Sequence, residues 1–163
     1  MRNFAEIEAS IKQCAQSEPD LPLDKVLLIR LLLHSASGYL EHRSRLLKDW
    51  DLNDTLFMAL VVLYTQQEHT IQPSKLSSIL GSSRTNATRI SDELVSRNWI
   101  ERVVSDADRR CFELKLTDKG KAFIKERLPQ QWRNIHAVFE GISEEEMQQL
   151  STILYKIIAN VSS

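Results

Sequence analysis

The spacing of apolar residues divides most of the chain into helices, with one extended region in its second half. Apolar residues recur every three or four positions, as on one face of an α-helix, in residues 3–17, 21–51, 54–67, 74–80 and 83–98, and again after Gly120. Two extended runs lie between: Ile-Glu-Arg-Val-Val from Ile100, and Cys-Phe-Glu-Leu-Lys-Leu from Cys111. The pattern predicts a mainly α-helical fold with a small β-hairpin.

Residues that start or stop helices stand at the ends of these segments. Helix starts are marked by side chains that can cap the first turn, or by a proline whose missing N–H costs nothing there: Asn53, Pro73, Ser82 or Ser83, and Ser143 with Glu146. Gly81 ends the helix over 74–80. Thr70 and Ile71 can form a short strand. Pro129 is expected to kink or split a helix over 121–140.

In the helix over 83–98, residues suited to packing in the core and residues suited to contacting DNA lie on different faces. Ala87, Ile90 and Leu94 share one face. The other face, which begins at the capping serine, carries short hydrogen-bonding side chains and guanidinium groups able to bind phosphates and base edges in a major groove: Ser83, Arg84, Thr85, Asn86, Thr88 and Arg89. The hairpin follows, and its tip reads Ser-Asp-Ala-Asp-Arg-Arg. The arrangement predicts a winged helix-turn-helix that binds DNA.

The hairpin and the residues after it resemble a known family. Asp108-Arg109-Arg110, followed by Leu116-Thr117-Asp118-Lys119-Gly120, is similar to the D-x-R…L-T-x-K-G signature of the MarR family of bacterial transcription regulators. Residues 56–60, 71–74 and 81–90 resemble its subgroup of multidrug-efflux repressors, and the resemblance spans roughly residues 23 to 160. It implies that Arg110 enters the minor groove, that Asp108 pairs with Arg110 and positions it, and that Arg109 contacts a phosphate.

Two segments outside the winged helix carry apolar surface that we expect a second subunit to cover. Residues 26–33 are apolar nearly all round, more than a surface helix of a small monomer tolerates. Near the C-terminus, apolar residues step by three and four, as in a coiled coil: Met147, Leu150, Leu154, Ile157 and Val161. A partner within the same chain is the alternative. We expect residues 1–52 and 121–163 to form a dimerisation layer around a DNA-binding region, 53–120, and the homodimer to bind a pseudo-palindromic operator in double-stranded DNA.

Composition excludes several other classes. The 163 residues suffice for one domain with a real core, and a net charge of −1 argues against a polycation that coats nucleic acid. No apolar run is long enough to span a bilayer and the N-terminus is unlike a secretion signal, so a cytoplasmic protein without membrane contact is expected. The spacing of cysteines, histidines and glycines supports no disulfide, metal site, cofactor or enzyme active site. Cys111, on a wing strand, is expected to be buried.

The resemblance further implies an effector. Members of the family commonly release DNA when a small aromatic or phenolic compound binds between the dimer layer and the winged helix. His34, Arg43 and Met58 are candidates to hold an aromatic anion, although residues of these types are more often ordinary core or surface residues. The expected function is a ligand-released repressor of multidrug-efflux or stress genes. The alternatives are a protein-interaction module with a degenerate winged helix and a redox-sensing regulator. The absence of a cysteine from residues 21–51 counts against redox sensing.

Overall fold

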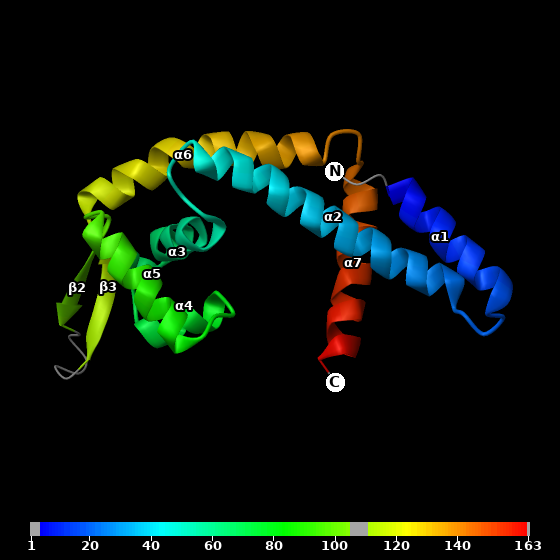
Figure 1. Cartoon of the computed structure of the whole chain (residues 1–163). Coiled ribbons are helices and arrows are strands. Elements are labelled where there is room, and N and C mark those ends of the chain that lie inside the picture. The colour runs from blue at the N-terminus through cyan, green and yellow to red at the C-terminus, as the bar shows by residue number, and fades with distance from the viewer. Residues whose placement is uncertain (1–3, 105–110, 163) are drawn as a thin grey trace.

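The computed structural model describes residues 4–104 and 111–162, which form mainly helices and one small sheet (Figure 1). The elements in chain order are α1 (Phe4–Ser17), α2 (Leu23–Lys48), α3 (Asp54–Thr65), the 3-10 turn η1 (Gln67–His69), β1 (Thr70–Ile71), α4 (Pro73–Ile79), α5 (Arg84–Ser96), β2 (Ile100–Val104), β3 (Phe112–Leu116), α6 (Asp118–Val138) and α7 (Glu144–Val161). The expected fold class is confirmed.

Three of the helix starts that were predicted from capping residues have the expected side-chain caps. The Asn53 Oδ1 atom accepts the Leu56 backbone N–H at 2.9 Å, and the Ser83 hydroxyl accepts that of Asn86 at 3.2 Å. Ser83, rather than Ser82, is therefore the cap of α5. At α7, Ser143 and Glu146 form the predicted reciprocal capping box.

The sheet has three antiparallel strands in the order β1-β3-β2. Strands β2 and β3 form the predicted hairpin, in which Ile100 lies opposite Leu116 and Val104 opposite Phe112. The short strand β1 pairs with the other edge of β3, with Ile71 opposite Leu114. The predicted strand at Thr70–Ile71 thus ties the start of the helix-turn-helix to the base of the wing.

Helix α6 differs from its prediction at both its start and its middle. It begins at Asp118, because the Thr117 hydroxyl caps it by accepting the Gly120 N–H at 3.0 Å. Pro129 lies inside the helix, which runs unbroken to Val138, so the predicted split is wrong (Figure 1). Ile124, Leu128 and Gln131 are buried on one face across the proline. This packing holds the helix together where one backbone hydrogen bond is lost.

The core lies under the winged helix, between α3, α4, α5, the sheet and the adjoining ends of α2 and α6. Its largest fully buried side chains are Phe57, Leu47, Leu56, Leu60, Leu63, Leu76, Ile90, Leu94, Ile100, Leu114, Leu116 and Ile124. We call this part of the molecule the head. Helices α2 and α6 extend from the head to the far end, where α1, α7 and both termini lie (Figure 1).

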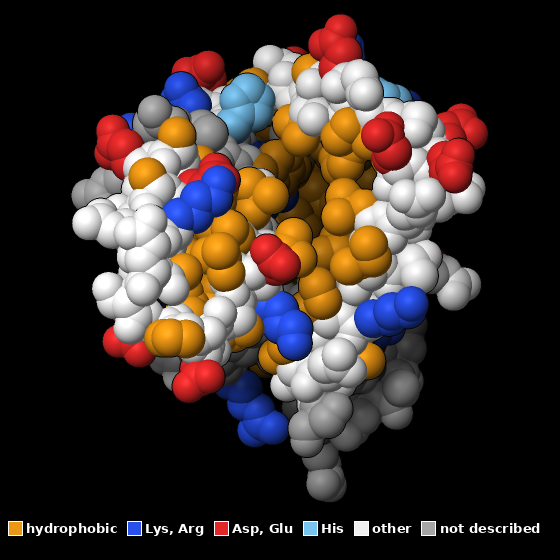
Figure 2. Space-filling view, turned by 90° about the vertical axis from the view of Figure 1, so that its right-hand side faces the viewer, with side chains coloured by type: hydrophobic (Ala, Val, Ile, Leu, Met, Phe, Trp, Pro, Cys, Tyr) orange, Lys and Arg blue, Asp and Glu red, His pale blue; other side chains and the backbone are white. Residues whose placement is uncertain are grey.

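The helices at that far end have little cover. Helices α1 and α7 contain no buried residue, and α2 buries only Leu47. Leu28 is 65% exposed and Leu33 is 54% exposed. Figure 2 shows apolar side chains gathered in and around a hollow on this face, with charged residues at its rim. Within the chain, then, the apolar first half of α2 is covered only in part.

Candidate nucleic-acid interface

Helix α5 presents the predicted polar face to solvent. Ala87, Ile90 and Leu94 are buried against the core, while Arg84, Thr85, Thr88 and Arg89 are exposed and Asn86 is half-buried. The amphipathic pattern therefore fixes the roll of the helix, because rotating it would expose the three apolar residues. The structure brings all six α5 residues that were predicted to contact DNA onto the N-terminal half of one helix or its cap.

Several of these polar groups already have partners. The Ser83 hydroxyl is engaged as the helix cap, and the Thr88 hydroxyl donates to the Arg84 carbonyl at 3.1 Å. The Arg89 Nη2 atom donates to Asn86 Oδ1 at 3.1 Å. Asn86 and Arg89 thus form a pair, one helical turn apart, whose remaining donors face outward.

The wing is attached to α5 by an ion pair. The Arg102 guanidinium on β2 binds the Asp92 carboxylate on α5 and lies over the Phe112 ring of β3, with 5.3 Å from Cζ to the ring centroid. The three residues join the helix to both strands of the hairpin. Asp108, Arg109 and Arg110, predicted at the wing tip, lie outside the described residues.

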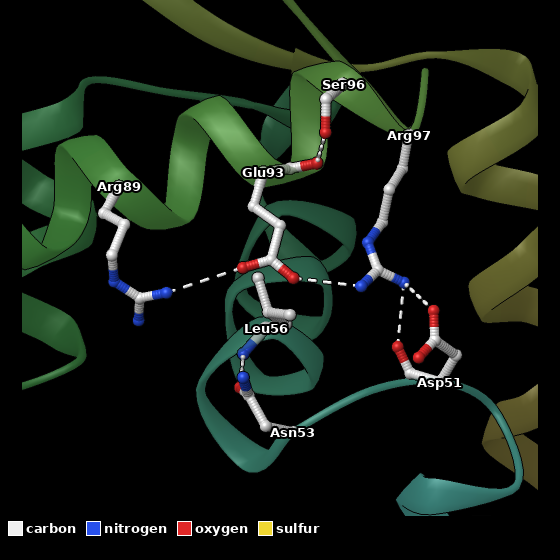
Figure 3. A network of polar contacts seen from close by, with 7 residues as sticks. All are labelled: Asp51, Asn53, Leu56, Arg89, Glu93, Ser96 and Arg97. Carbon is white, nitrogen blue, oxygen red and sulfur yellow. Dashed lines mark hydrogen bonds and ion pairs between the residues drawn. The ribbon is translucent and has the colours of Figure 1, made fainter.

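A chain of polar contacts extends from α5 to the turn between α2 and α3 (Figure 3). The Glu93 carboxylate binds Arg89 at 3.5 Å and Arg97 at 2.9 Å. Arg97 in turn donates from Nη1 to the backbone carbonyl of Asp51 at 2.8 Å and to its carboxylate at 3.0 Å. Glu93, Arg97 and Asp51 were not among the site residues predicted from the sequence. The i, i+4 spacing of Arg89, Glu93 and Arg97 was a signal for the first two.

Rings and guanidinium groups stack where the head meets the long helices. Arg97 lies over Trp99 at 5.2 Å, Trp99 stacks on Phe123 of α6 at 4.2 Å, and Arg127 lies over Phe123 at 3.9 Å. Arg127 also faces the Trp50 ring, at 5.8 Å, after the end of α2. We call these five residues the stacked joint. It connects α5 and β2 with α6 and with the α2–α3 turn.

Comparisons with known proteins identify the group to which this head belongs. The model of the MarR family matches residues 52–112. Transcriptional repressor MprA of Escherichia coli K12 is 48% identical over 159 residues, which cover 98% of this chain and 90% of MprA. The chain belongs to the MarR family. Its relationship to a transcriptional repressor confirms the prediction of a regulator rather than an enzyme.

Solved MarR-family structures have the same fold. AbsC of Streptomyces coelicolor superposes with a TM-score of 0.81 at 17% identity, over 87% of this chain and 97% of AbsC. A mutant MarR of Escherichia coli, complexed with operator DNA, superposes with a TM-score of 0.72 at 24% identity, over 85% of this chain and 98% of that one. The winged helix-turn-helix prediction is thereby confirmed at the level of the fold.

Two of the three candidate effector residues lie together in this MarR-family chain. The Arg43 Nη1 atom is 3.9 Å from the sulfur of Met58, and the Arg43 guanidinium also binds Asp54 and lies over the Tyr39 ring. Gln131 of α6, which is buried, donates to the Tyr39 hydroxyl at 3.4 Å. His34 lies apart, against the Phe4 ring of α1 at 5.3 Å. The structure therefore does not support one site containing all three residues.

The cysteines are Cys14 on α1 and Cys111 beside the wing, and both are exposed. The expected burial of Cys111 is wrong, because burial in β3 begins only at Leu114, and even the neighbouring Phe112 is exposed. Within residues 4–104 and 111–162 there is no group of three or more His, Cys, Asp or Glu side chains that could hold a metal ion. Nor is any helix in the described part of the chain long and apolar enough to cross a membrane.

Proposed function

We propose that this chain is a transcriptional repressor that binds a pseudo-palindromic operator as a homodimer. The observation that carries the proposal is the exposed polar face of α5, fixed beside a wing by the pair of Asp92 and Arg102. The relationship to repressor MprA supports it. Residues 53–120 would bind the DNA, and residues 1–52 and 121–163 would hold the two subunits together.

Exposed apolar surface supports the homodimer. Helices α2 and α7 line a common groove of about 290 Å³, and its walls are apolar except for one serine: Leu28, Ile29, Leu31, Leu32, Ser35, Leu150, Ile153, Leu154 and Ile157. A monomer rarely leaves so much contiguous apolar surface in water. In a two-fold dimer the same surface of each subunit covers the other. Two heads then meet half-sites about one helical turn, ~34–36 Å, apart.

On the DNA, Arg84, Thr85, Asn86 and Arg89 would lie in the major groove, and Thr88 and Ser83 at its edge. One bidentate pair of an arginine with guanine contributes roughly 1–3 kcal/mol of discrimination between bases. For the wing, the family resemblance supports a minor-groove contact by Arg110, positioned by Asp108, and a phosphate contact by Arg109. A bacterial DNA-binding repressor acts in the cytoplasm.

We also propose that a small aromatic or phenolic effector releases the operator. The half-buried Arg43, which is paired with Asp54, lies beside Met58 and the Tyr39 ring, so an anionic effector there would compete with the Asp54 carboxylate for the cation. Such a setting suits an aromatic anion. The regulated genes would encode multidrug efflux or a stress response, as the resemblance to efflux repressors suggests.

Selection of bound sequences from a random DNA pool tests the proposed function. We expect a two-fold symmetric consensus with A·T-rich flanks, and binding that weakens steeply as salt rises, since each phosphate contact releases counterions. Arg84→Ala and Arg89→Ala should relax base preference inside the half-sites. Arg110→Ala should flatten the preference for the flanks. A purified, folded dimer that selects no sequence at any salt concentration would instead be a protein-interaction module.

A further inference from the structure

Glu93 occupies the middle of the polar chain that leads from the DNA-facing side of α5 to the α2–α3 turn. Asn86 binds Arg89. From there Arg89 binds Glu93, Glu93 binds Arg97, and Arg97 binds Asp51 (Figure 3). Each link joins groups of complementary charge or hydrogen-bonding capacity. These contacts therefore connect two side chains on the polar face of α5 with the backbone of the α2–α3 turn, where Arg97 donates to the Asp51 carbonyl.

Exposure falls from Arg89 through Glu93 to Arg97, although the carboxylate of Asp51, the last residue of this series of contacts, is itself exposed. The Arg89 side chain is 61% exposed, that of Glu93 is 30% exposed and that of Arg97 is 26% exposed. Arg97 is further held because Lys119 donates to its backbone carbonyl at 3.0 Å and because its guanidinium lies over Trp99. Glu93 is thus bound on one side to a partly buried arginine with several partners, Arg97, and on the other to an exposed one, Arg89.

A carboxylate at this place is unfavourable for DNA binding unless it has a second role. Phosphates repel it, and an arginine already bound to it is partly neutralised. The second role is to orient Arg89. Its planar guanidinium is held between Glu93 and Asn86 in the absence of DNA. An arginine fork oriented in advance loses less side-chain freedom when it makes two hydrogen bonds to one base.

We propose that Glu93 is a positioning residue for sequence recognition, which aligns Arg89 and Asn86 in the major groove and is itself anchored through Arg97 on the turn at Asp51. The inference rests on the proposed DNA-binding function. The proposal predicts that Glu93 affects the choice of base and not the overall strength of DNA binding. Removing the carboxylate should lower the preference for the correct base at the position that Arg89 contacts, and should leave binding to unrelated DNA unchanged or slightly stronger.

The test compares wild type, Glu93→Gln, Arg89→Ala and the double variant on operators that differ at single half-site positions, at fixed salt. Glu93→Gln should reduce base preference about five-fold or more at the position that Arg89→Ala also relaxes, since a bidentate contact supplies discrimination of that order. Combining both changes should give no further loss, because Glu93 acts through Arg89. A role in helix stability alone would lower binding to all sites equally and would overturn the proposal.

Asp92→Asn is the matched control, since it removes one negative charge at the neighbouring position of α5, where the partner is Arg102 of the wing. Because this pair fixes the wing beside α5, Asp92→Asn should weaken binding to all sites, but it should leave the preference at the base that Arg89 contacts intact. An equal loss of preference in Asp92→Asn and Glu93→Gln would mean that charge, not alignment, matters, and would overturn the proposal. If wild type itself selects no sequence, the proposed function fails with it.

A second variant tests the anchor without changing α5. Asp51→Asn keeps the backbone carbonyl that binds Arg97 but removes the carboxylate. Asp51 has a φ of 54°, which asparagine tolerates well, and its side chain is 93% exposed, so folding should be unaffected. We expect a smaller loss of preference at the same base position. If neither Asp51→Asn nor Glu93→Gln changes the base preference at this position, Glu93 does not position Arg89 and the proposal is overturned.

Discussion

Gly120 illustrates how one residue sets the geometry of the head. It lies in the first turn of α6, where that helix crosses the start of β2. A Cβ atom there would be 2.1 Å from the Trp99 carbonyl oxygen and 3.1 Å from Cδ2 of Leu116. The glycine of the L-T-D-K-G motif is therefore required by the close approach of α6 to the base of the wing.

Gly120→Ala should lower the free energy of unfolding by about 1–3 kcal/mol or more, because α6 must shift away from β2 to admit the methyl group. Urea unfolding at fixed protein concentration measures the loss. Gly141→Ala is the control: its Cβ would meet no atom within 4 Å, and only its positive φ of 81° would be strained. If the two variants lose the same free energy of unfolding, the close contact with Trp99 is not the reason that position 120 needs glycine.

At this scale the sequence predicted local features better than distant contacts. The caps at Asn53, Ser83 and Ser143 depend on residues three positions away and were correct. The contact of Arg97 with Asp51 joins residues 46 positions apart. No local pattern encodes such a distance, and the same reason explains why the sequence could not show that His34 packs against Phe4 while Arg43 lies beside Met58.

Among the elements, α7 has the most fully satisfied start. Glu146 accepts the Ser143 backbone N–H and the Ser143 hydroxyl, both at 2.8 Å. These two hydrogen bonds, the backbone one first, hold the pKa of the Glu146 carboxyl below its ordinary value. A lowered pKa in the folded state means that the carboxylate stabilises the helix above the ordinary glutamate pKa and loses this effect as pH falls through the lowered one.

Glu146→Gln should therefore destabilise the protein at neutral pH and make little difference in acid, well below the ordinary glutamate pKa of about 4.3. Thermal unfolding followed by circular dichroism at both pH values measures the difference from wild type. Glu145→Gln is the control, because it removes the same charge from a neighbouring residue that does not cap the helix and accepts a hydrogen bond from Gln149. A pH-independent difference for Glu146→Gln would contradict the role of the ionised carboxylate.

Predictions for whole elements succeeded where the apolar period was long and failed where packing decided. All seven helices were expected, because their apolar faces repeat over two or more turns. Pro129 was expected to kink or split α6, and the predicted split did not occur, since residues on either side of it are buried on one face. That face was not recognisable from the sequence, because one of its members is the polar Gln131.

For the molecule as a whole, the exposed apolar residues of α2 and α7 determine its state of association. Replacing Leu154 and Ile157 together by glutamate should convert a dimer to monomers or insoluble protein, because both line the apolar groove between these helices. Sedimentation at micromolar concentration distinguishes the states. The matched control, Gln148→Glu with Gln149→Glu, places two charges on a polar side of α7 and should remain dimeric. A monomeric wild type would contradict the proposed architecture.

Effector and operator should oppose one another across this dimer. If a small aromatic carboxylate or phenol favours a spacing of the heads that does not fit DNA, linkage requires it to bind more weakly when operator is present. Titration of such compounds with and without operator measures both affinities. Arg43→Ala should reduce the effect, whereas Arg45→Ala, at an exposed position of the same helix, should not. Equal effector affinity in both titrations would exclude this mechanism.

The stacked joint also gives the molecule an optical property. The protein has three tryptophans. Trp50 and Trp99 each lie beside a guanidinium in this joint, whereas Trp132 is 54% exposed on α6. A positive charge next to an indole shifts the energy of its excited state, so the emission colour depends on how the head sits against the long helices. In a Trp132→Phe protein, all tryptophan fluorescence would come from the joint, and head movement on binding DNA or effector could be followed without any attached dye.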